Sequence, residues 1–375
     1  MTTIRFNLQP LSDVLLFRNG KSVKPGGIGE FPVYGSNGVI GGNDEYKEEN
    51  GIILGRVGAY CGTVAYYPGK FWASDNTIVA YPKNADHDVR FLAYLLRELR
   101  LNRWAGGAAQ PLLTQSVLKR IEAPIPKPRT QRKIAAILSA YDDLIDNNLR
   151  RIKILEEMAQ LVYREWFVNF RFPGHEKVRM VESELGPIPD GWDIVRTEDL
   201  VKRISSGKKY EQRTVSAVGA IPVLDQGRSG IIGYHDDEPG VRASEEQPVI
   251  VFANHTCYQR IIQYPFSAIQ NVLPFIANPE RTRNIYWLHW AIKDLVKFND
   301  YKGHWPEFMT KKLVCPPANC TEEFGQVISP IVRLIYKLEM QNQFLRRTRD
   351  LLLPKLISGE LDVSELDIDM EGAPQ

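Results

Sequence analysis

Residues 131–166, QRKIAAILSAYDDLIDNNLRRIKILEEMAQLVYREW, carry the pattern that decides the fold. Apolar side chains recur there at alternating steps of four and three residues, which is coiled-coil spacing. Residues 322–356, EEFGQVISPIVRLIYKLEMQNQFLRRTRDLLLPKL, keep this spacing 190 residues later. We therefore expect two long helices that pair with each other, with buried asparagines that fix their register. The predicted seam residues are Ile134, Leu138, Ile145, Asn148, Ile152, Leu155, Ile328, Ile335, Asn342 and Leu345.

Two prolines lie within the second helical stretch. Because proline has no amide hydrogen and its ring obstructs the preceding turn, Pro330 is predicted to kink or delay this helix. Pro354 is predicted to end or bend it near Leu353. Asp142 and Asp143 lie beside the first seam, and a solvated helix face accounts for them.

The helical stretches belong to a larger internal repeat. GEFPVYGSNGVIG at 29–41 matches GAIPVLDQGRSGIIG at 219–233, and KRIEAPIP at 119–126 matches KKLVCPP at 311–317. Matches in one order at offsets near 190 predict two copies of a mixed α/β block, each followed by a Pro-rich exit and a long helix. The predicted strands are 51–54, 63–67, 77–81, 249–253, 259–264 and 272–277, and the predicted block helices are 89–103 and 284–297.

The repeat and the Pro/Gly-containing segments divide the chain into six parts. The predicted limits are a first block at 1–128, a central long helix at 129–168, a linker at 169–191, a second block at 192–320, a distal long helix at 321–360 and an acidic tail at 361–375.

Composition narrows the class of protein. The 375 residues are 43% hydrophobic and 25% charged, which excludes wholesale disorder. No apolar run approaches the roughly 20 residues that span a bilayer, no signal-peptide core opens the chain, and four cysteines are too few for a disulfide scaffold, so we expect a cytoplasmic protein without a membrane partner. The formal net charge is +2, but six acidic residues lie after residue 359. The first 359 residues therefore carry a net charge of +8, which favours binding to a polyanion.

Sequence motifs of common enzymes are missing. The chain contains no Asp/Asn-Pro-Pro-Phe/Tyr tetrapeptide of amino-methyltransferases, no phosphate-binding G-x-x-x-x-G-K-S/T loop and no compact nuclease cluster. Cys315 and Cys320 have no second ligand pair nearby, so we expect no metal site. His255 and Cys257 lie two residues apart and could form a catalytic pair in which the cysteine is the nucleophile. No acidic residue that would orient the histidine is evident, and ordinary packing also explains the two residues.

Basic and amide residues cluster in loop-like sequence of both blocks. Such side chains contact phosphates and base edges, and neighbouring glycines permit close backbone approach, although a single loop Gln or Lys is often only solvated. Gln110 follows Gly106 and Gly107, and Lys302 and His304 occupy the comparable place in the second copy. The candidate DNA-binding residues are Lys21, Lys24, Arg103, Gln110, Lys208, Lys209, Arg213, Lys302 and His304.

Several stretches together resemble a known family. They are PIPKPRTQRKIAAILSAYDDLIDNNLRRIKILEEMAQLVYREWF at 124–167, ESELGPIPDGW at 182–192, TRDLLLPKLISGEL at 348–361 and, less specifically, YKGHWPEF at 301–308. Along essentially its whole length the chain resembles the specificity (S) subunit of type I restriction–modification enzymes.

The resemblance implies a fold and a division of labour. It implies two globular target-recognition domains, related by an internal pseudo-twofold repeat and held apart by two long antiparallel coiled-coil helices. Each domain would read one half of a bipartite double-stranded DNA site. Two methyltransferase (M) subunits would dock on this non-catalytic scaffold and methylate adenine N6 with S-adenosylmethionine, so that no cofactor is expected in this chain. Restriction (R) subunits, which translocate DNA and cut it, would join them.

Two other functions remain open at the level of sequence. One is a protein-interaction adaptor whose coiled coil is its function. The other is a hydrolase or nuclease that uses His255 and Cys257 or an acid cluster not evident in the sequence. Sequence-dependent DNA binding separates the first from a DNA-reading subunit, and hydrolysis by the purified chain separates the second.

We predict that the purified chain alone neither methylates nor cleaves DNA, because the motifs for S-adenosylmethionine binding and amine activation are missing. Methyl transfer from labelled S-adenosylmethionine and nicking of plasmid DNA measure the two activities. Turnover that disappears when one of the chain's own acids or cysteines is replaced would contradict this prediction.

Overall fold

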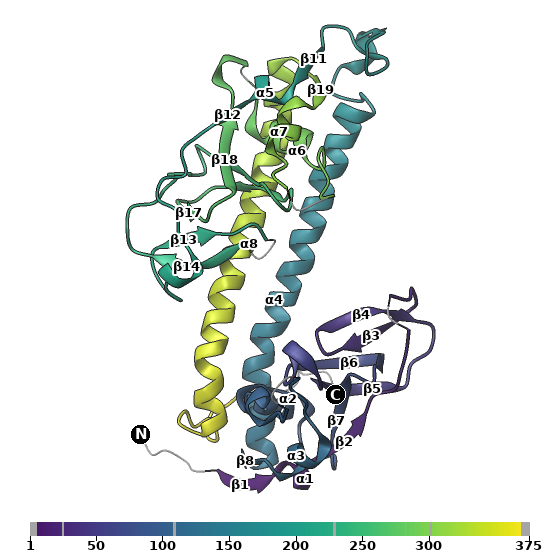
Figure 1. Ribbon diagram of the computed structural model, residues 1–375, viewed down its shortest axis with the longest axis vertical. Helices are drawn as coiled ribbons and strands as arrows, with labels where there is room; N and C mark the ends of the chain where they lie inside the picture. The colour runs from purple at the N-terminus through teal and green to yellow at the C-terminus, as the bar shows by residue number, and fades with distance from the viewer. Residues whose placement is uncertain are drawn as a thin grey trace. The chain divides into compact units, whose positions relative to one another are not determined.

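The computed structural model describes residues 6–24, 26–107, 110–227, 230–281, 283–299 and 302–368. The chain divides into two compact units, each of which is described by itself. Unit 1 consists of Met1–Asn147 and Gln341–Gln375, and unit 2 consists of Asn148–Met340. The two predicted long helices are confirmed as α4 (Pro128–Tyr163) and α8 (Ala318–Ser358), and each contributes residues to both units (Figure 1).

Unit 1 is built on a six-stranded sheet in the order β2-β7-β5-β6-β3-β4. The strands are β2 (Leu15–Asn19), β3 (Phe31–Gly35), β4 (Gly38–Asn43), β5 (Glu48–Gly55), β6 (Val64–Ala73) and β7 (Thr77–Pro82). Neighbours are antiparallel except β3 and β6, which run parallel with Val33 opposite Trp72. A separate antiparallel pair joins β1 (Asn7–Pro10) to β8 (Glu122–Ile125).

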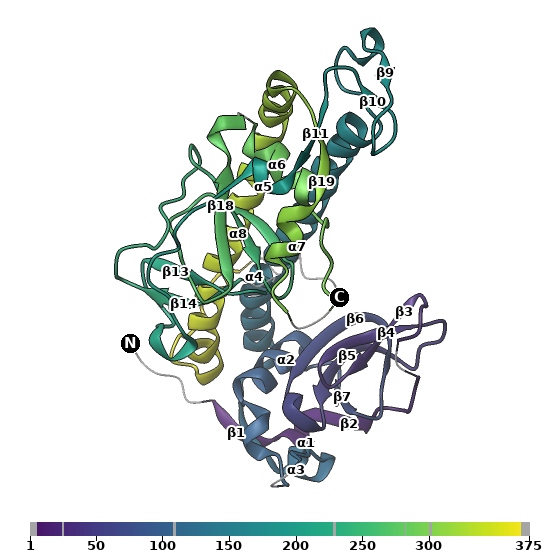
Figure 2. The ribbon, with the colours of Figure 1, turned by 45° about the horizontal axis from the view of Figure 1, so that its top comes forward.

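Short helices cover this sheet. They are α1 (Leu11–Val14), α2 (Val89–Glu98) and α3 (Gln115–Arg120). Helix α2 lies against β5, β6 and β7, as Figure 1 and Figure 2 show. It begins at Val89 because the Asp88 carboxylate accepts a hydrogen bond from the Phe91 amide at 2.8 Å. Phe91 and Leu95 on α2 are fully buried with Ile52 of the sheet, so helix and sheet share one core.

Unit 2 repeats this fold. Its strands form the sheets β12-β18-β15-β16 and β14-β13-β17 and the antiparallel pair β11–β19. Their bounds are β11 (Asp193–Arg196), β12 (Val201–Arg203), β13 (Ile221–Leu224), β14 (Ile231–His235), β15 (Val249–Ala253), β16 (Gln259–Ile262), β17 (Ser267–Ala268), β18 (Val272–Ala277) and β19 (Lys312–Cys315). The parallel pairing of Val223 with Ser267 corresponds to that of Val33 with Trp72. The helices α5 (Thr197–Leu200), α6 (Ile285–Ile292) and α7 (Trp305–Thr310) follow in the order of α1, α2 and α3. The predicted internal repeat is therefore confirmed.

The long helices complete the core of each unit and run antiparallel. In unit 1, Leu138 near the start of α4 packs in one core with Leu356 near the end of α8. In unit 2, Tyr163 at the end of α4 contacts Phe324 near the start of α8, with ring centroids 6.2 Å apart. The predicted seam residues are all buried or half-buried: Ile134, Leu138, Ile145, Asn148, Ile152, Leu155, Ile328, Ile335, Asn342 and Leu345.

The alternative that Pro354 would end α8 near Leu353 is wrong, whereas a kink at Pro330 and a bend at Pro354 stay predictions. The helix continues without a break through Pro330 and Pro354 to Ser358. Both prolines lie on its exposed face, where water can solvate the carbonyl that loses its partner. The buried residues on the opposite face, among them Phe324 and Leu356, hold the helix in its core.

The solvated face expected for Asp142 and Asp143 is corrected for Asp142 and confirmed for Asp143, whose side chain is 62% exposed. Asp142 accepts a hydrogen bond from the Tyr94 hydroxyl at 2.5 Å and forms an ion pair with Arg349 of α8. Asp143 pairs with Arg90 of α2 at 3.3 Å. Burial, together with the bond to Asp142, raises the pKa of the Tyr94 hydroxyl. Asp142 therefore ties α2, α4 and α8 together within unit 1.

The predicted linker and tail both contribute to packing. Phe172 and Ile188 in the linker are buried in the core of unit 2, and the rings of Phe172 and Trp192 lie 5.1 Å apart. The linker also forms a short antiparallel pair, β9 (Met180–Val181) with β10 (Ile188–Pro189). In the tail, Val363 is buried in the core of unit 1, and residues 369–375 lie outside the described residues. The domain limits from sequence stay predictions.

We predict that Asp142→Ala lowers the free energy of unfolding of unit 1 by about 1.5–3 kcal/mol, because it leaves Tyr94 and the half-buried Arg349 without this acceptor. The matched variant Asp143→Ala removes a carboxylate that is 62% exposed and should cost less than about 1 kcal/mol. Urea denaturation followed by circular dichroism measures both. Equal losses for the two variants would show that Asp142 is not the stronger link.

Candidate nucleic-acid interface

Four connecting segments of unit 1 meet at one place, which we call the loop junction. Arg56, just after β5, donates its amide to the Asn76 carbonyl at 2.9 Å and to Ser36 Oγ at 3.3 Å. The Ser36 hydroxyl itself donates to Asn76 O at 2.6 Å. The Arg56 carbonyl accepts from the Leu113 amide, at the start of α3, at 2.9 Å. A Cβ on Gly55 would lie 2.3 Å from the Tyr60 carbonyl, so this junction closes only around glycine.

Unit 2 contains the same loop junction with different residues. Asn254, just after β15, donates its amide to the Asn271 carbonyl at 2.8 Å and accepts from the His304 amide at 2.9 Å. The next amide, that of His255, donates to Gln226 Oε1 at 3.0 Å. In unit 1 the corresponding Val57 amide lies 3.4 Å from Ser36 Oγ. The shared bonds come mainly from the main chain, so the two junctions keep one geometry while their side chains differ.

Two of the predicted residues of unit 1, Gln110 and Lys21, lie beside segments of this junction. Gln110 is exposed in the loop before α3. Two main-chain hydrogen bonds between Gly106 and Leu112, of 2.8 and 3.0 Å, close this loop. Lys21 and Lys24 are exposed. The Lys21 amide donates to the Ala73 carbonyl at 2.8 Å, beside the turn that contains Asn76. Arg103 is exposed in a 3₁₀ turn, Leu101–Trp104.

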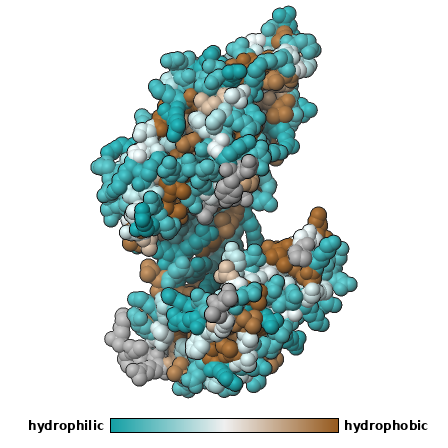
Figure 3. All heavy atoms as spheres, viewed as in Figure 1, coloured by the Kyte–Doolittle hydropathy of each residue, from teal (hydrophilic) through white to brown (hydrophobic). Residues whose placement is uncertain are grey.

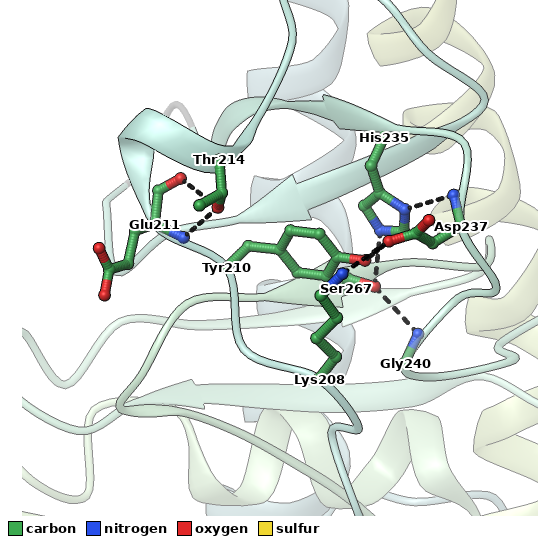
Figure 4. A network of polar contacts seen from close by, with 8 residues as sticks. All are labelled: Lys208, Tyr210, Glu211, Thr214, His235, Asp237, Gly240 and Ser267. Atoms are coloured by element: carbon green, nitrogen blue, oxygen red, sulfur yellow. Dashed lines mark hydrogen bonds and ion pairs between the residues drawn. The ribbon is translucent and has the colours of Figure 1, made fainter.

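A basic segment occupies the same place in unit 2. Its Tyr210 amide lies 3.4 Å from the Ala268 carbonyl, the counterpart of Ala73. Figure 4 shows how this segment is held: Tyr210 stacks on His235 at 4.2 Å and donates its hydroxyl to Asp237 at 2.9 Å. Because the Asp237 amide donates to His235 Nδ1, the imidazole carries its proton on Nε2 and donates that to Ser267 Oγ at 2.9 Å.

Carboxylates compensate two of the three predicted cations in this segment. Lys208 pairs with Asp237 at 2.8 Å, and its hydrogen bond lowers the pKa of that carboxyl. Arg213 pairs with Glu211 at 2.7 Å. Lys209 contacts the Ser206 hydroxyl, and burial and the nearby Arg203 lower its pKa. Within the described ranges no carboxylate forms an ion pair with Lys209 or Arg203. The positive charges of these two side chains are therefore not compensated.

The predicted pair in the loop before α7 separates in the structure. Lys302 is exposed, and its carbonyl accepts from His255 Nδ1 at 3.1 Å. His304 is fully buried and lies 3.8 Å from Glu307. A buried ring has no surface for a ligand, so Lys302 is the one available to DNA, and the proposal of His304 as a DNA contact is withdrawn.

Sequence reasoning missed Arg56 and Gln226, which lie in the middle of the two junctions. Their position in the sequence could have identified them, because each lies just after a strand of the internal repeat. Apolar surface also gathers at the β3–β4 end of unit 1 (Figure 3). Ile28 there is 99% exposed and Val39 60% exposed, whereas most of the face seen in Figure 3 is hydrophilic.

The arrangement does not support a Cys–His nucleophile. His255 donates Nδ1–H to a carbonyl, and burial together with Glu307 raises the pKa of the Cys257 thiol, which disfavours the thiolate. Among residues that the structure describes, no three His, Cys, Asp or Glu side chains gather as metal ligands. Nor does any described helix have the length and apolarity needed to cross a bilayer.

Comparison with known proteins finds similarity to one family. Residues 10–157 match the model of the type I restriction modification DNA specificity domain. The chain is 28% identical over 304 residues to the type I restriction enzyme MjaIX specificity subunit of Methanocaldococcus jannaschii, covering 74% of this chain and 70% of that protein. It is 29% identical over 146 residues to the EcoprrI specificity subunit of Escherichia coli, 36% of each chain.

A solved structure has the same fold. The crystal structure of the type I restriction–modification S subunit from M. genitalium superposes with a TM-score of 0.62 at 17% identity. The match covers 95% of this chain and 97% of that one. The likeness therefore extends over both units.

Proposed function

We propose that this chain is a specificity subunit of a type I restriction–modification enzyme and that it reads a bipartite double-stranded DNA site, one half with each unit. The observation that carries the proposal is the loop junction, which both units build with the same main-chain bonds and different side chains. Two copies of one scaffold with different exposed groups suit two half-sites of different sequence. The exposed Gln110 and Lys302 lie in corresponding loops before α3 and α7.

We further propose that the chain is not catalytic and that its partners perform the chemistry. Two methyltransferase subunits would supply the S-adenosylmethionine site and methylate adenine, and restriction subunits would cleave. The raised pKa of the Cys257 thiol and the His255 bond to a carbonyl support a non-catalytic role. The free state of all four cysteines suits the cytoplasm, where bacterial and archaeal DNA lies.

The first test exchanges one reading unit. Residues 1–128 are replaced by the corresponding residues of a relative with another target, and the variant is co-expressed with its methyltransferase. We expect one half of the methylated motif to change and the other to stay, because Lys302 and its neighbours are untouched. Mapping N6-methyladenine across the host genome measures the motif. A change in both halves would show that the units do not read separately.

The second test concerns phosphate contacts of unit 2. If Lys209 binds a phosphate, Lys209→Ala should reduce the slope of log affinity against log salt by about one and weaken binding to all sequences alike. The control Arg196→Gln/Glu198→Gln removes an exposed ion pair of zero net charge at residues outside the candidate site and should leave the slope unchanged. Fluorescence anisotropy of the complex with labelled duplex at several salt concentrations measures it. An unchanged slope in the Lys209 variant would place this lysine away from DNA.

A further inference from the structure

Two side chains of the unit 2 loop junction have polar atoms that the fold does not use. His255 and Gln226 are both half-buried and are joined by the 3.0 Å bond from the His255 amide to Gln226 Oε1. A second bond fixes the pair, since Thr256 Oγ1 donates to the Gln226 carbonyl at 2.6 Å. Within the described part of the chain, neither His255 Nε2 nor Gln226 Nε2 has a hydrogen-bond partner, and neither is a fully buried atom.

The hydrogen bonds determine what each free atom offers. A carbonyl oxygen only accepts, so the 3.1 Å contact between His255 Nδ1 and the Lys302 carbonyl places the ring proton on Nδ1. The neutral ring then presents Nε2 as an acceptor. A main-chain N–H only donates, so the His255 amide fixes Oε1 of Gln226 toward itself. The Gln226 NH₂ group is left as a donor.

We propose that Gln226 and His255 together read an adenine in the half-site of unit 2. Adenine presents an acceptor, N7, and a donor, the N6 amino group, side by side in the major groove. The Gln226 NH₂ group donates to N7, and His255 Nε2 accepts from the N6 amino group. This assignment rests on the proposed function, since it requires that the loop junction faces DNA.

Both side chains are held before DNA arrives, which favours a specific contact over a solvated loop. The ring of His255 is fixed by Lys302 at Nδ1, and the amide of Gln226 is fixed at Oε1. Rigid polar groups lose little conformational freedom on binding and leave unpaired atoms when the wrong base is present. Unit 1 has no counterpart, because Ser36 and Val57 occupy these places, and the Ser36 hydroxyl is used by Asn76.

Two conservative variants separate reading from folding. His255→Asn retains an N–H near the position of Nδ1, and thus the bond to the Lys302 carbonyl, but has no atom at Nε2. Gln226→Glu retains the acceptor for the His255 amide but replaces the donor by a second acceptor. The matched control is His175→Asn, the same substitution at a linker histidine outside the loop junction, whose Nδ1 also contacts a carbonyl, that of Phe172, at 2.9 Å.

The experiment uses the complex with the methyltransferase subunits and duplexes that carry the mapped motif, in mildly alkaline buffer that keeps imidazoles neutral. Each adenine of the unit 2 half-site is replaced in turn by 7-deazaadenine, which lacks N7, or by 2-aminopurine, which lacks the 6-amino group. At one adenine we expect each replacement to weaken wild-type binding about two- to tenfold, the share of one hydrogen bond in a bidentate base contact. Gln226→Glu should become insensitive to 7-deazaadenine at that adenine, and His255→Asn to 2-aminopurine, while His175→Asn keeps both sensitivities.

The possible outcomes are distinct. The inference is overturned if wild-type binding tolerates both replacements at every adenine, if the half-site contains no adenine, or if the two variants keep the wild-type sensitivities. A wild-type complex that binds a duplex with both half-sites scrambled as tightly as the mapped motif would instead overturn the proposed function. If one variant does not fold, the other variant still tests the contact between its own side chain and the base, at N7 for Gln226 or at the N6 amino group for His255.

Discussion

Burial of α4 against α8 is the constraint on which the rest of the structure depends. In unit 1, Leu138 and Leu356 are more than 200 residues apart in sequence and share one core. The core of unit 1 therefore forms only when these two distant segments of the chain are in contact. The tail strengthens this closure, because the Lys133 ammonium, which is 3% exposed, donates to the carbonyls of Ser364 and Leu366 at 2.5 and 2.7 Å. Satisfying a buried cation with carbonyl oxygens limits the cost of its desolvation.

The repeated pattern predicted most of the fold because burial follows sequence period. The heptads predicted α4 and α8, and short apolar runs predicted strands such as β7 and β15, whose central residues are buried on both faces. Helix α8 does not end at Pro354, because this proline lies on a face that water can reach and the buried face of the helix stays packed. Local propensity has little weight where tertiary packing holds the helix.

The candidate site was less predictable, since polar roles depend on contacts distant in sequence. Nothing near Asp142 predicts that Tyr94 and Arg349 lie against it. Likewise, Lys208 and Lys209 are neighbours with the same charge, yet only Lys208 has a carboxylate partner. His304 resembles Lys302 as a loop residue but is buried, directly before the start of α7. The sequence shows which side chains are charged, but it does not show which of them have a partner of opposite charge in the fold.

The loop junction explains how one scaffold can carry two specificities. Bonds such as Arg56 N to Asn76 O and Asn254 N to Asn271 O depend on the main chain, so a change of side chain leaves them intact. Positions next to these bonds can then vary in hydrogen-bonding character, from Val57 in unit 1 to His255 in unit 2, without loss of the fold. Uncompensated cations such as Lys209 would add affinity for any sequence, because phosphates carry no base information. Affinity and specificity would thus come from different residues of the same unit, and substitution at the junction would change the target while binding to the phosphate backbone persists.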